Sequence, residues 1–488
     1  MIHIRFFLLT SARAISLRRI FAISTMENSE NSKLYTRQEV LRLVGLGIPG
    51  LLMSISALTS CSKFPMPDKN FSGTVGIVGG GIAGLYAGYM LQQQGISVMI
   101  YEASDRKGGR IRSQSDLIDH PVEWGAHRIW GENHALFQLL TANGVEWVDQ
   151  AIQDYAYVEG FWLSEAIMGD QQSVKKLNSI IDGLKTYEGA DMSANLYATI
   201  KGLPASTQPI WNARLGIKNG ATTDIMGIEG IASSIQNASS GTNERLVRSG
   251  DLESLILSTF RDVPITYSTP IVDVDYSGSK VVLTDTNGVE WKHDKVLVTA
   301  PIPILKNNIQ FYPTLPSKAQ AAIDGTSMRG GLQVLLTFNQ RFWPGDAKRL
   351  QMDGLCPNFE VIGSGGRSNL NLNLMANLFG TAYETALEGP MPIVPALLQQ
   401  LDTYYGDNIA TNSWVNSESY DWGQDPWIQG TQSYSPVGGS EVRYGFAESV
   451  NQKLYWAGEA THTEGHHGTI HGAMETAVRA VQQILEEA

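Results

Sequence analysis

Cysteine is almost absent from this 488-residue sequence, which contains only Cys61 and Cys356. Two cysteines are too few for a disulfide framework, and neither lies in a cluster with the ligand spacing of a metal site. Zinc and iron–sulfur chemistry are therefore excluded as interpretations, and we predict no metal.

Positive charge is also scarce. The chain has 36 Lys and Arg residues against 48 Asp and Glu residues, which gives a formal net charge of -12. A protein that binds the phosphates of nucleic acid needs a basic face. We therefore predict no nucleic-acid partner.

A long uninterrupted apolar run is missing as well. A membrane-spanning helix needs about 20 apolar residues, whereas the apolar segment 43–59 is interrupted by Pro49 and by several glycines. Because the segment follows Arg37 and Arg42, it is typical of an export signal, and a transmembrane anchor is the weaker interpretation.

The end of this segment resembles a bacterial lipobox, Leu-Thr-Ser-Cys at 58–61, in which Cys61 becomes the lipidated first residue. Residues 36–42 resemble a twin-arginine export motif with Gln38 in place of the second arginine. We expect residues 1–70 to be the leader of an exported periplasmic or membrane-tethered lipoprotein, which contacts the membrane only through its lipid.

Other interpretations of the N-terminal segment stay open. Residues 1–25 contain four arginines and no acidic residue, as an organelle transit peptide would, and translation from Met26 would remove them. A disordered leader on a cytoplasmic protein also fits.

Glycine, in contrast, is plentiful at 49 residues, and one cluster follows the short apolar run 75–78. Gly79, Gly81 and Gly84 have the G-x-G-x-x-G spacing of dinucleotide-binding folds. There the first glycine permits a tight turn, the second lets the backbone approach a pyrophosphate, and the third lets the helix pack closely. A helix over 85–94, a strand over 97–101 and then Glu102 as ribose acceptor would complete a βαβ unit.

Further segments carry a related pattern. Residues 106–110 read Arg-Lys-Gly-Gly-Arg, where Arg110 can offset pyrophosphate charge. The segment 454–480 reads as a strand ending in Gly458-Glu459 and then a helix. With residues 269–274 and 295–301, these motifs resemble the flavin-containing amine oxidase superfamily, and most closely the L-amino-acid oxidases and dehydrogenases, over residues 74–488.

The resemblance implies an α/β fold, with an FAD-binding Rossmann-like domain of the glutathione-reductase type interleaved with an α+β substrate-binding domain. The FAD-binding domain is expected to comprise residues 71–135, 235–315 and 445–488. The substrate-binding domain is expected to comprise residues 136–234 and 316–444.

The same resemblance implies a cofactor site for FAD. The expected cofactor-binding residues are Gly79, Gly81, Ile82, Ala83, Gly84, Glu102, Ala103, Gly109, Arg110, Gly125, Ala126, His127, Arg128, Ile271, Gly458, Glu459, Gly468, Thr469, Ile470, His471, Gly472 and Ala473. We call the segment 454–480 the closing motif. Family members with covalently bound flavin use a cysteine before this motif, and no cysteine follows Cys356. FAD is therefore expected to bind non-covalently.

The expected active-site residues are Arg128, Gln333, Trp427, Gly468 and Thr469. Arg128 matches the arginine that holds the substrate carboxylate in L-amino-acid oxidases, although it could instead pair with a protein carboxylate such as Glu123. Trp427 matches one wall of the family's aromatic cage, or belongs to the core. Thr469 replaces the opposite aromatic wall.

Gln333 lies where the oxidases carry a lysine that holds a water beside the flavin. Without that cation, reoxidation by oxygen should be slow, so a quinone is an alternative acceptor. We expect oxidative deamination of an L-amino acid to a 2-keto acid and ammonia. The alternatives are a polyamine or monoamine oxidase on the same fold and a non-catalytic FAD-binding protein. A homodimer is also possible from the sequence.

Overall fold

The computed structural model describes residues 70–148, 150–238, 241 and 243–487. The predicted leader and its Cys61 lie outside the described residues, apart from Asn70 at its end. Among the described residues, no helix combines the length and the apolar character needed to cross a bilayer. All the described residues belong to one compact unit.

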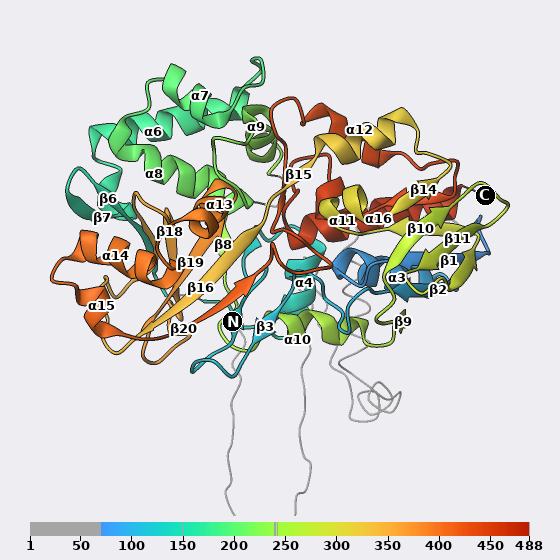
Figure 1. Ribbon diagram of the computed structural model, residues 1–488, viewed down its shortest axis with the longest axis horizontal. Coiled ribbons are helices and arrows are strands. Elements are labelled where there is room, and N and C mark those ends of the chain that lie inside the picture. Colours follow the sequence, from blue (N-terminus) through green and yellow to red (C-terminus); the bar gives the residue numbers. More distant parts are fainter. Residues whose placement is uncertain (1–69, 149, 239–240, 242, 488) are drawn as a thin grey trace, which may run out of the picture. The chain divides into compact units, whose positions relative to one another are not determined.

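The first sheet has five parallel strands in the order β22-β13-β1-β2-β9. Strands β1, β2 and β9 are labelled in Figure 1. Their bounds are β1 Thr74–Val78, β2 Ser97–Tyr101, β9 Ile265–Thr266, β13 Lys295–Val298 and β22 Leu454–Trp456. The central strands are apolar because both faces of the sheet are covered. This βαβ arrangement confirms the fold class expected from the glycine motif.

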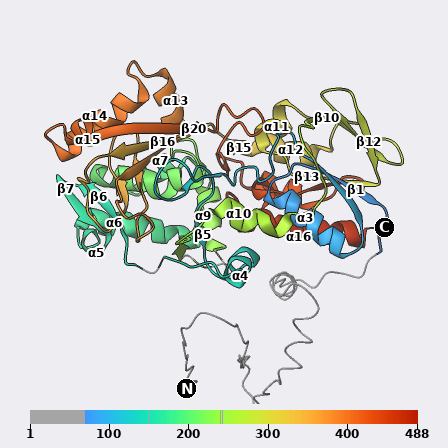
Figure 2. The same cartoon turned by 90° about the horizontal axis from the view of Figure 1, so that it is seen from below.

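Helices cover one face of this sheet. Helix α3 (Ile82–Gln93) lies beside α16 (Ile470–Glu486), as Figure 2 shows, and both pack into the core that contains Val75 and Ile77 of β1. The other face packs against an antiparallel ribbon with one added parallel strand, in the order β12-β11-β10-β14. Its strands are β10 Ile271–Asp275, β11 Val281–Asp285, β12 Glu290–His293 and β14 Gln310–Tyr312.

The largest sheet has seven strands in the order β20-β16-β19-β18-β17-β6-β7. The bounds are β6 Gln153–Val158, β7 Phe161–Ser164, β16 Gly331–Phe338, β17 Ala347–Gln351, β18 Asn358–Ile362, β19 Asn373–Phe379 and β20 Trp414–Asp421. One face is apolar and packs on α13 (Thr381–Glu388) and α14 (Ile393–Tyr405). The other face carries polar side chains that line a cavity.

A group of helices continues from β7 and packs on β6 through a separate apolar core. These helices are α5 Glu165–Met168, α6 Gln172–Asp182, α7 Ala194–Ile200, α8 Gln208–Trp211 and α9 Ile228–Gln236. The remaining helices are α4 Ala135–Ala142, α10 Leu252–Leu257, α11 Ile302–Asn307, α12 Ser317–Gly325 and α15 Ile409–Ser413. Short paired strands are β3 Ser113–Gln114 with β4 Val122–Glu123, β5 Ile129–Trp130 with β8 Glu244–Arg245, and β15 Ser327–Met328 with β21 Ser433–Tyr434.

Two helices pack on the other side of the domain limits that the sequence led us to expect. Leu136 and Leu140 of α4 pack in the same core as α3 and α16, although the expected limit fell at residue 135. Ala322 and Ile323 of α12 pack with the four-stranded sheet, although the expected limit fell at residue 315. Each helix is amphipathic, so its sequence shows that one face is buried without showing which core receives it.

Candidate active site

A cavity of about 1500 Å³ is lined by residues from the five-stranded sheet and from the polar face of the seven-stranded sheet. Single small-molecule sites usually enclose about 300 to 1,000 Å³. The cavity is therefore large enough for a dinucleotide together with a second small molecule.

The three motif glycines have the separate tasks that their spacing predicts. Gly79 has a φ of +107°, which favours glycine. A Cβ on Gly84 would lie 2.1 Å from the carbonyl oxygen of Gly79, so only glycine permits this close packing. A Cβ on Gly81 would meet nothing within 4 Å, because this residue faces the cavity.

The N-terminus of α3 is prepared for an anion. Its N-cap is Gly81, which supplies no side-chain hydrogen bond, and the first turn contains no acidic residue. The N–H groups of a helix start and the helix dipole both favour a phosphate. Glu102 lies at the end of β2, where its Oε2 accepts a hydrogen bond of 2.6 Å from the Gly80 N–H. These residues fit the pyrophosphate and ribose of FAD.

Arg110 and Glu459 meet in the cavity although 349 positions separate them. The Arg110 Nη1 lies 2.7 Å from the Glu459 Oε1, and the Gly468 N–H donates to Glu459 Oε2 at 2.7 Å. Burial raises the pKa of Glu459, but Arg110 and the hydroxyl of Ser433 more than reverse this, so the pKa is lowered. The carboxylate therefore stays ionised and ties the first motif to the last.

Helix α16 begins at this point. Thr469 is its N-cap, with Oγ1 accepting a hydrogen bond of 2.9 Å from the Gly472 N–H. Of the closing-motif residues expected to contact the cofactor, Gly468, Thr469, Ile470 and Ala473 line the cavity. His471 and Gly472 do not, which corrects the expectation for both. His471 instead stacks on His134 with ring centroids 4.4 Å apart, and a Cβ on Gly472 would lie 2.0 Å from a carbonyl oxygen.

Apart from Gly84, His471 and Gly472, every residue expected to bind the cofactor or substrate lines the cavity. Gly84 acts through helix packing, as its position in the motif predicts. Cys356 is buried, with its Sγ donating to the carbonyl oxygen of Asn358 in β18, and it does not line the cavity.

Arg128 lies in the cavity wall with its charge already compensated. Its Nη1 is 3.0 Å from Glu244 Oε1, its Nη2 is 2.6 Å from Glu360 Oε1, and its Nε donates to His127. The alternative partner Glu123 instead accepts hydrogen bonds from Ser113 Oγ and Leu252 N. Arg128 therefore has protein carboxylates as partners, although not the one expected.

Electrostatics strengthen this arrangement. Burial lowers the pKa of the Arg128 guanidinium, but Glu244 and Glu360 outweigh burial and raise it. Burial raises the pKa of Glu360, but Arg128 and His127 more than reverse this, and the pKa falls well below its usual range. The guanidinium of Arg128 and the carboxylates of Glu244 and Glu360 therefore stay charged near neutral pH.

Gln333 is fully buried within a hydrogen-bonded group on the polar sheet face. Its Nε2 donates to Asn377 Oδ1 at 3.0 Å, and its Oε1 accepts from Trp422 Nε1 at 3.1 Å. Trp427 also lines the cavity, on the loop after β20, where Asp425 accepts a hydrogen bond from its backbone N–H. The placement of Trp427 thus fits a wall facing the substrate.

Several cavity residues have no motif that would identify them in the sequence. They come from strands of the large sheet and from the helices beside it, and they are Asp154, Lys218, Arg349, Gln351, Asn358 and Glu360. Polar residues at alternate positions of β17 and β18 were the available signal, because a polar residue inside a buried strand needs a partner or a ligand.

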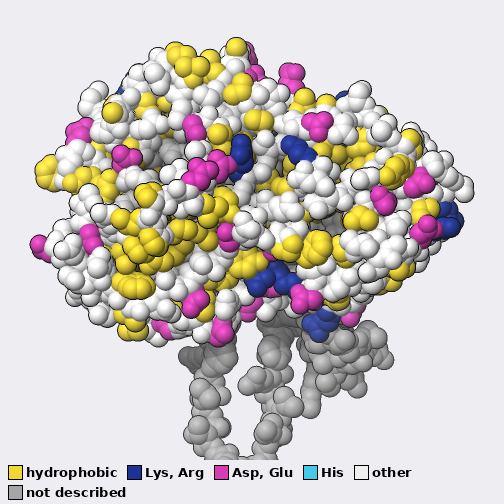
Figure 3. Space-filling model, viewed as in Figure 1, with side chains coloured by type: hydrophobic (Ala, Val, Ile, Leu, Met, Phe, Trp, Pro, Cys, Tyr) yellow, Lys and Arg dark blue, Asp and Glu magenta, His cyan; other side chains and the backbone are white. Residues whose placement is uncertain are grey.

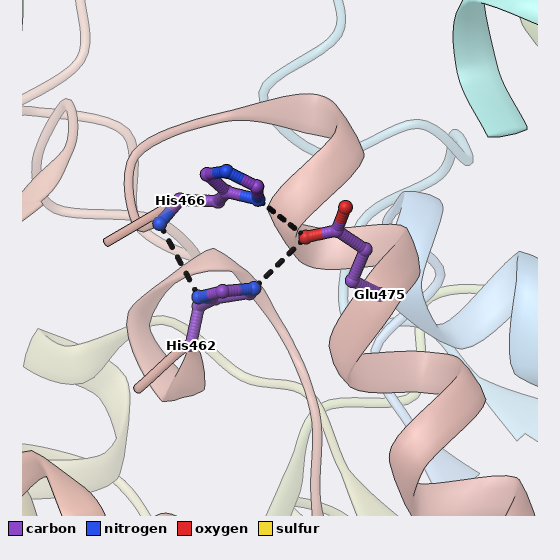
Figure 4. A group of neighbouring side chains, drawn as sticks. All are labelled: His462, His466 and Glu475. Carbon is purple, nitrogen blue, oxygen red and sulfur yellow. Dashed lines mark hydrogen bonds and ion pairs between the residues drawn. The ribbon is translucent and has the colours of Figure 1, made fainter. Parts of the chain in front are cut away.

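A second polar cluster lies at the start of α16, outside the cavity lining. His462 Nε2 and His466 Nδ1 both contact Glu475 Oε2, at 2.9 and 2.7 Å (Figure 4). His462 Nδ1 accepts from the backbone N–H groups of Glu464 and His466. Because Nδ1 accepts, the proton of the neutral ring lies on Nε2, which leaves that nitrogen no lone pair for a metal. The cluster is better suited to holding the loop.

Surface charge is dispersed on the face shown in Figure 3, where basic side chains lie singly or in small groups among acidic and apolar ones. This face offers no extended basic patch for a polyanion.

The chain was compared with known proteins. Residues 170–485 match the family described as flavin containing amine oxidoreductase, and residues 77–142 match the NAD(P)-binding Rossmann-like domain. Lysine-specific histone demethylase 1 homolog 1 of Arabidopsis thaliana is 26% identical over 84% of this chain and 52% of its own length. Probable polyamine oxidase 4 of the same plant is 24% identical over 86% of this chain and 88% of its own length.

Among solved structures, cyclohexylamine oxidase from Brevibacterium oxydans IH-35A superposes with a TM-score of 0.70 at 21% identity, covering 86% of this chain and 99% of that chain. Wild-type putrescine oxidase bound to putrescine superposes with a TM-score of 0.72 at 18% identity, covering 85% and 99%. These likenesses confirm the expected fold class. The chain spans about half the length of the demethylase relative, so the activity of that whole protein does not transfer.

Proposed function

Because the chain belongs to the flavin-containing amine oxidoreductase family, we propose that it uses FAD to oxidise an amine that lacks an α-carboxylate. The substrate class is then a simple amine, a diamine or a polyamine, and the L-amino acid favoured by the sequence motif becomes the second candidate. Relatives and structural neighbours named for polyamine, cyclohexylamine and putrescine oxidation support this choice.

The observation that carries the proposal is the pairing of Arg128. A guanidinium attracts a substrate carboxylate when it is otherwise uncompensated in an apolar pocket. Here Glu244 and Glu360 already accept from both terminal nitrogens, and a third carboxylate would face two like charges. An amine avoids that repulsion.

FAD supplies the chemistry when bound, because its ring accepts hydride from the carbon beside the amine. The protein residues have to orient the substrate and exclude water. Trp427 offers a flat apolar wall, and Gln333 lies on the polar sheet face that lines the same cavity. Selecting the neutral amine removes the need for a separate general base.

The test is anaerobic mixing of the FAD-loaded protein with a substrate panel. Loss of the oxidised flavin absorbance should be fastest with an alkyl amine or a diamine and slower with every L-amino acid. If no amine lowers the absorbance of the oxidised flavin, the protein is instead a non-catalytic FAD-binding protein.

Lys218 favours the second candidate, an L-amino acid. Its Nζ lies 3.8 Å above the ring of Trp130 at the cavity wall, and it makes no ion pair within the part of the chain that the structure describes. Burial lowers the pKa of this ammonium group, as expected for a cation without a close counterion. A preference for amino acids that disappears in Lys218→Met but persists in Arg128→Lys would establish it.

A further inference from the structure

Lys218 is the only lysine among the described residues that line the active-site cavity. Its side chain is exposed, although the preceding residue, Ile217, is buried. Burial nevertheless lowers the pKa of the Lys218 ammonium group. Both observations hold because the side chain projects into a cavity that the protein encloses. A ligand in the cavity can therefore reach this nitrogen.

A short turn fixes the position of Lys218. The residue lies in a 3-10 turn that ends at Gly220, whose φ is +77°. Thr431 Oγ1 donates a hydrogen bond of 3.1 Å to the carbonyl oxygen of Gly220. The next residue, Gln432, donates from Nε2 to the carbonyl oxygen of Gly468 at 2.7 Å. The turn is thereby tied to the start of α16, where the closing motif lines the cavity.

The amino group of Lys218 has no counterion of its own. Its Nζ lies 3.8 Å above the ring of Trp130, and no ion pair joins it to another described residue. The carboxylates of Glu244 and Asp154 both pair with Arg349, at 2.8 and 2.7 Å. The indole face can hold an amine without consuming the nitrogen lone pair, because an N–H can point at the ring.

The surrounding charges leave this amine partly neutral. Burial lowers its pKa most, Arg128 and Lys348 lower it further, and the carboxylates of Glu244 and Asp154 reverse only part of the shift. Each unit of lowering raises the neutral fraction near pH 7 about tenfold. A neutral, desolvated lysine amine is the form that attacks carbonyl carbon to give a Schiff base.

We propose that Lys218 captures carbonyl compounds in the cavity as a Schiff base, with an alkyl aldehyde as the ligand class. A bond forms between Nζ and the carbonyl carbon, and the carbonyl oxygen leaves as water. No oxidant or reductant is consumed, and water reverses the step. The aldehyde is the product that amine oxidation releases, so its natural source rests on the proposed function. Capture holds the product in the cavity and delays the next turnover.

Two other lysines separate the effect of the cavity from that of burial alone. Burial also lowers the pKa of Lys306, but its Nζ donates to two backbone carbonyl oxygens, at 2.9 and 2.8 Å, and it does not line the cavity. The side chain of Lys292 is 62% exposed to solvent. If Lys218 is the capture site, it should react faster than both.

The first experiment needs no turnover. FAD-loaded wild type is incubated at pH 7 with hexanal and sodium cyanoborohydride, which reduces a Schiff base to a stable secondary amine. Peptide mass spectrometry at early times gives the rate of hexyl labelling at each lysine. Lys218 should be labelled roughly tenfold faster than Lys292, because a larger fraction of its amine is neutral, and Lys306 should be labelled more slowly than either.

The variants test the assignment. Lys218→Arg keeps a positive charge but has no amine that forms a Schiff base, so the fast label should disappear. Lys218→Met should lose it as well, which covers the case that one of the two variants folds poorly. Lys306→Arg is the matched control and should leave the fast label on Lys218.

The second experiment uses turnover. The fastest amine of the substrate panel is mixed aerobically with the FAD-loaded wild type, and sodium borohydride is added during the reaction. The carbon chain of that amine should appear on Lys218 of the wild type and should be absent from Lys218→Arg.

Labelling of Lys218 by hexanal at or below the rate of Lys292 would overturn the capture site. An enzyme that turns over without acquiring the substrate chain on Lys218 would overturn capture of the product. If no amine is oxidised, the proposed function fails, and the hexanal rates still decide whether Lys218 captures carbonyl compounds.

Discussion

At the scale of single residues, Arg128 fits two roles, that of a structural cation and that of a clamp for a substrate carboxylate. A mutation can tell the two roles apart. As a structural cation it pairs with Glu244 and Glu360, so its loss strands the buried carboxylate of Glu360, whereas Glu244 keeps Lys348 and Arg349 as partners. We predict that Arg128→Met lowers the free energy of unfolding by about 3 to 5 kcal/mol, measured by chemical denaturation of the FAD-loaded protein.

The control is the double variant Arg128→Met, Glu360→Gln, which removes one stranded charge together with its partner. It should recover part of the lost stability. A stable Arg128→Met that fails only with carboxylated substrates would return Arg128 to the carboxylate-binding role.

Gln333 lacks the positive charge that would favour electron transfer to oxygen. We predict that Gln333→Lys speeds reoxidation of the reduced protein by oxygen roughly a hundredfold, because a cation stabilises the negative charge that develops on oxygen. Stopped-flow mixing of reduced protein with aerated buffer measures the rate, and a soluble quinone is the comparison acceptor.

Gln333→Met is the matched variant without a charge, and it should not gain this rate. Since Gln333 bonds to Trp422 and Asn377, both variants are expected to lose some stability. A wild type that already reacts as fast with oxygen as with the quinone would contradict the argument.

At the scale of the element, the turn from β1 into α3 separates packing from cofactor binding within three residues. We predict that Gly81→Ala keeps the wild-type stability of the flavin-free protein but weakens FAD binding, because its new methyl group would enter the cavity. Gly84→Ala should destabilise the fold itself, because its methyl group meets the Gly79 carbonyl.

Flavin titration and thermal denaturation of the flavin-free variants measure the two effects separately. Equal behaviour of Gly81→Ala and Gly84→Ala in both assays would refute the division of roles.

The start of α16 should make stability depend on pH. Burial lowers the pKa of His462 and of His467, so the folded chain holds these rings neutral. Below about pH 6.5 the unfolded chain takes up protons that the folded chain does not, and stability falls as the pH falls. His467→Asn should reduce this slope by up to about 1.4 kcal/mol per pH unit, measured by denaturation between pH 8 and pH 5.

The sequence indicated the elements whose geometry is local. The bounds of β2 and the tasks of Gly79, Gly81 and Gly84 follow from short patterns that act over a single turn. The pairing of Arg128 with Glu244 and Glu360 does not, because the three residues lie on three different strands or loops and meet only through the fold.

At the scale of the whole molecule, the leader lies outside the described residues, and export stays a proposal. We predict that a bacterial host cleaves the chain just before Cys61 and attaches lipid to its sulfur. Mass spectrometry of the mature N-terminus, with Cys61→Ser as control, measures this. A soluble cytoplasmic protein that retains residues 26–60 would contradict it.

The Arg110–Glu459 pair has a consequence for the order of events during synthesis. One half of the flavin cradle is translated early, whereas the other half arrives with β22 and α16. A nascent chain from which α16 has not yet emerged thus carries a nucleotide motif without its closing wall. Flavin capture should therefore wait for α16, and a truncated translation product that lacks α16 should be colourless.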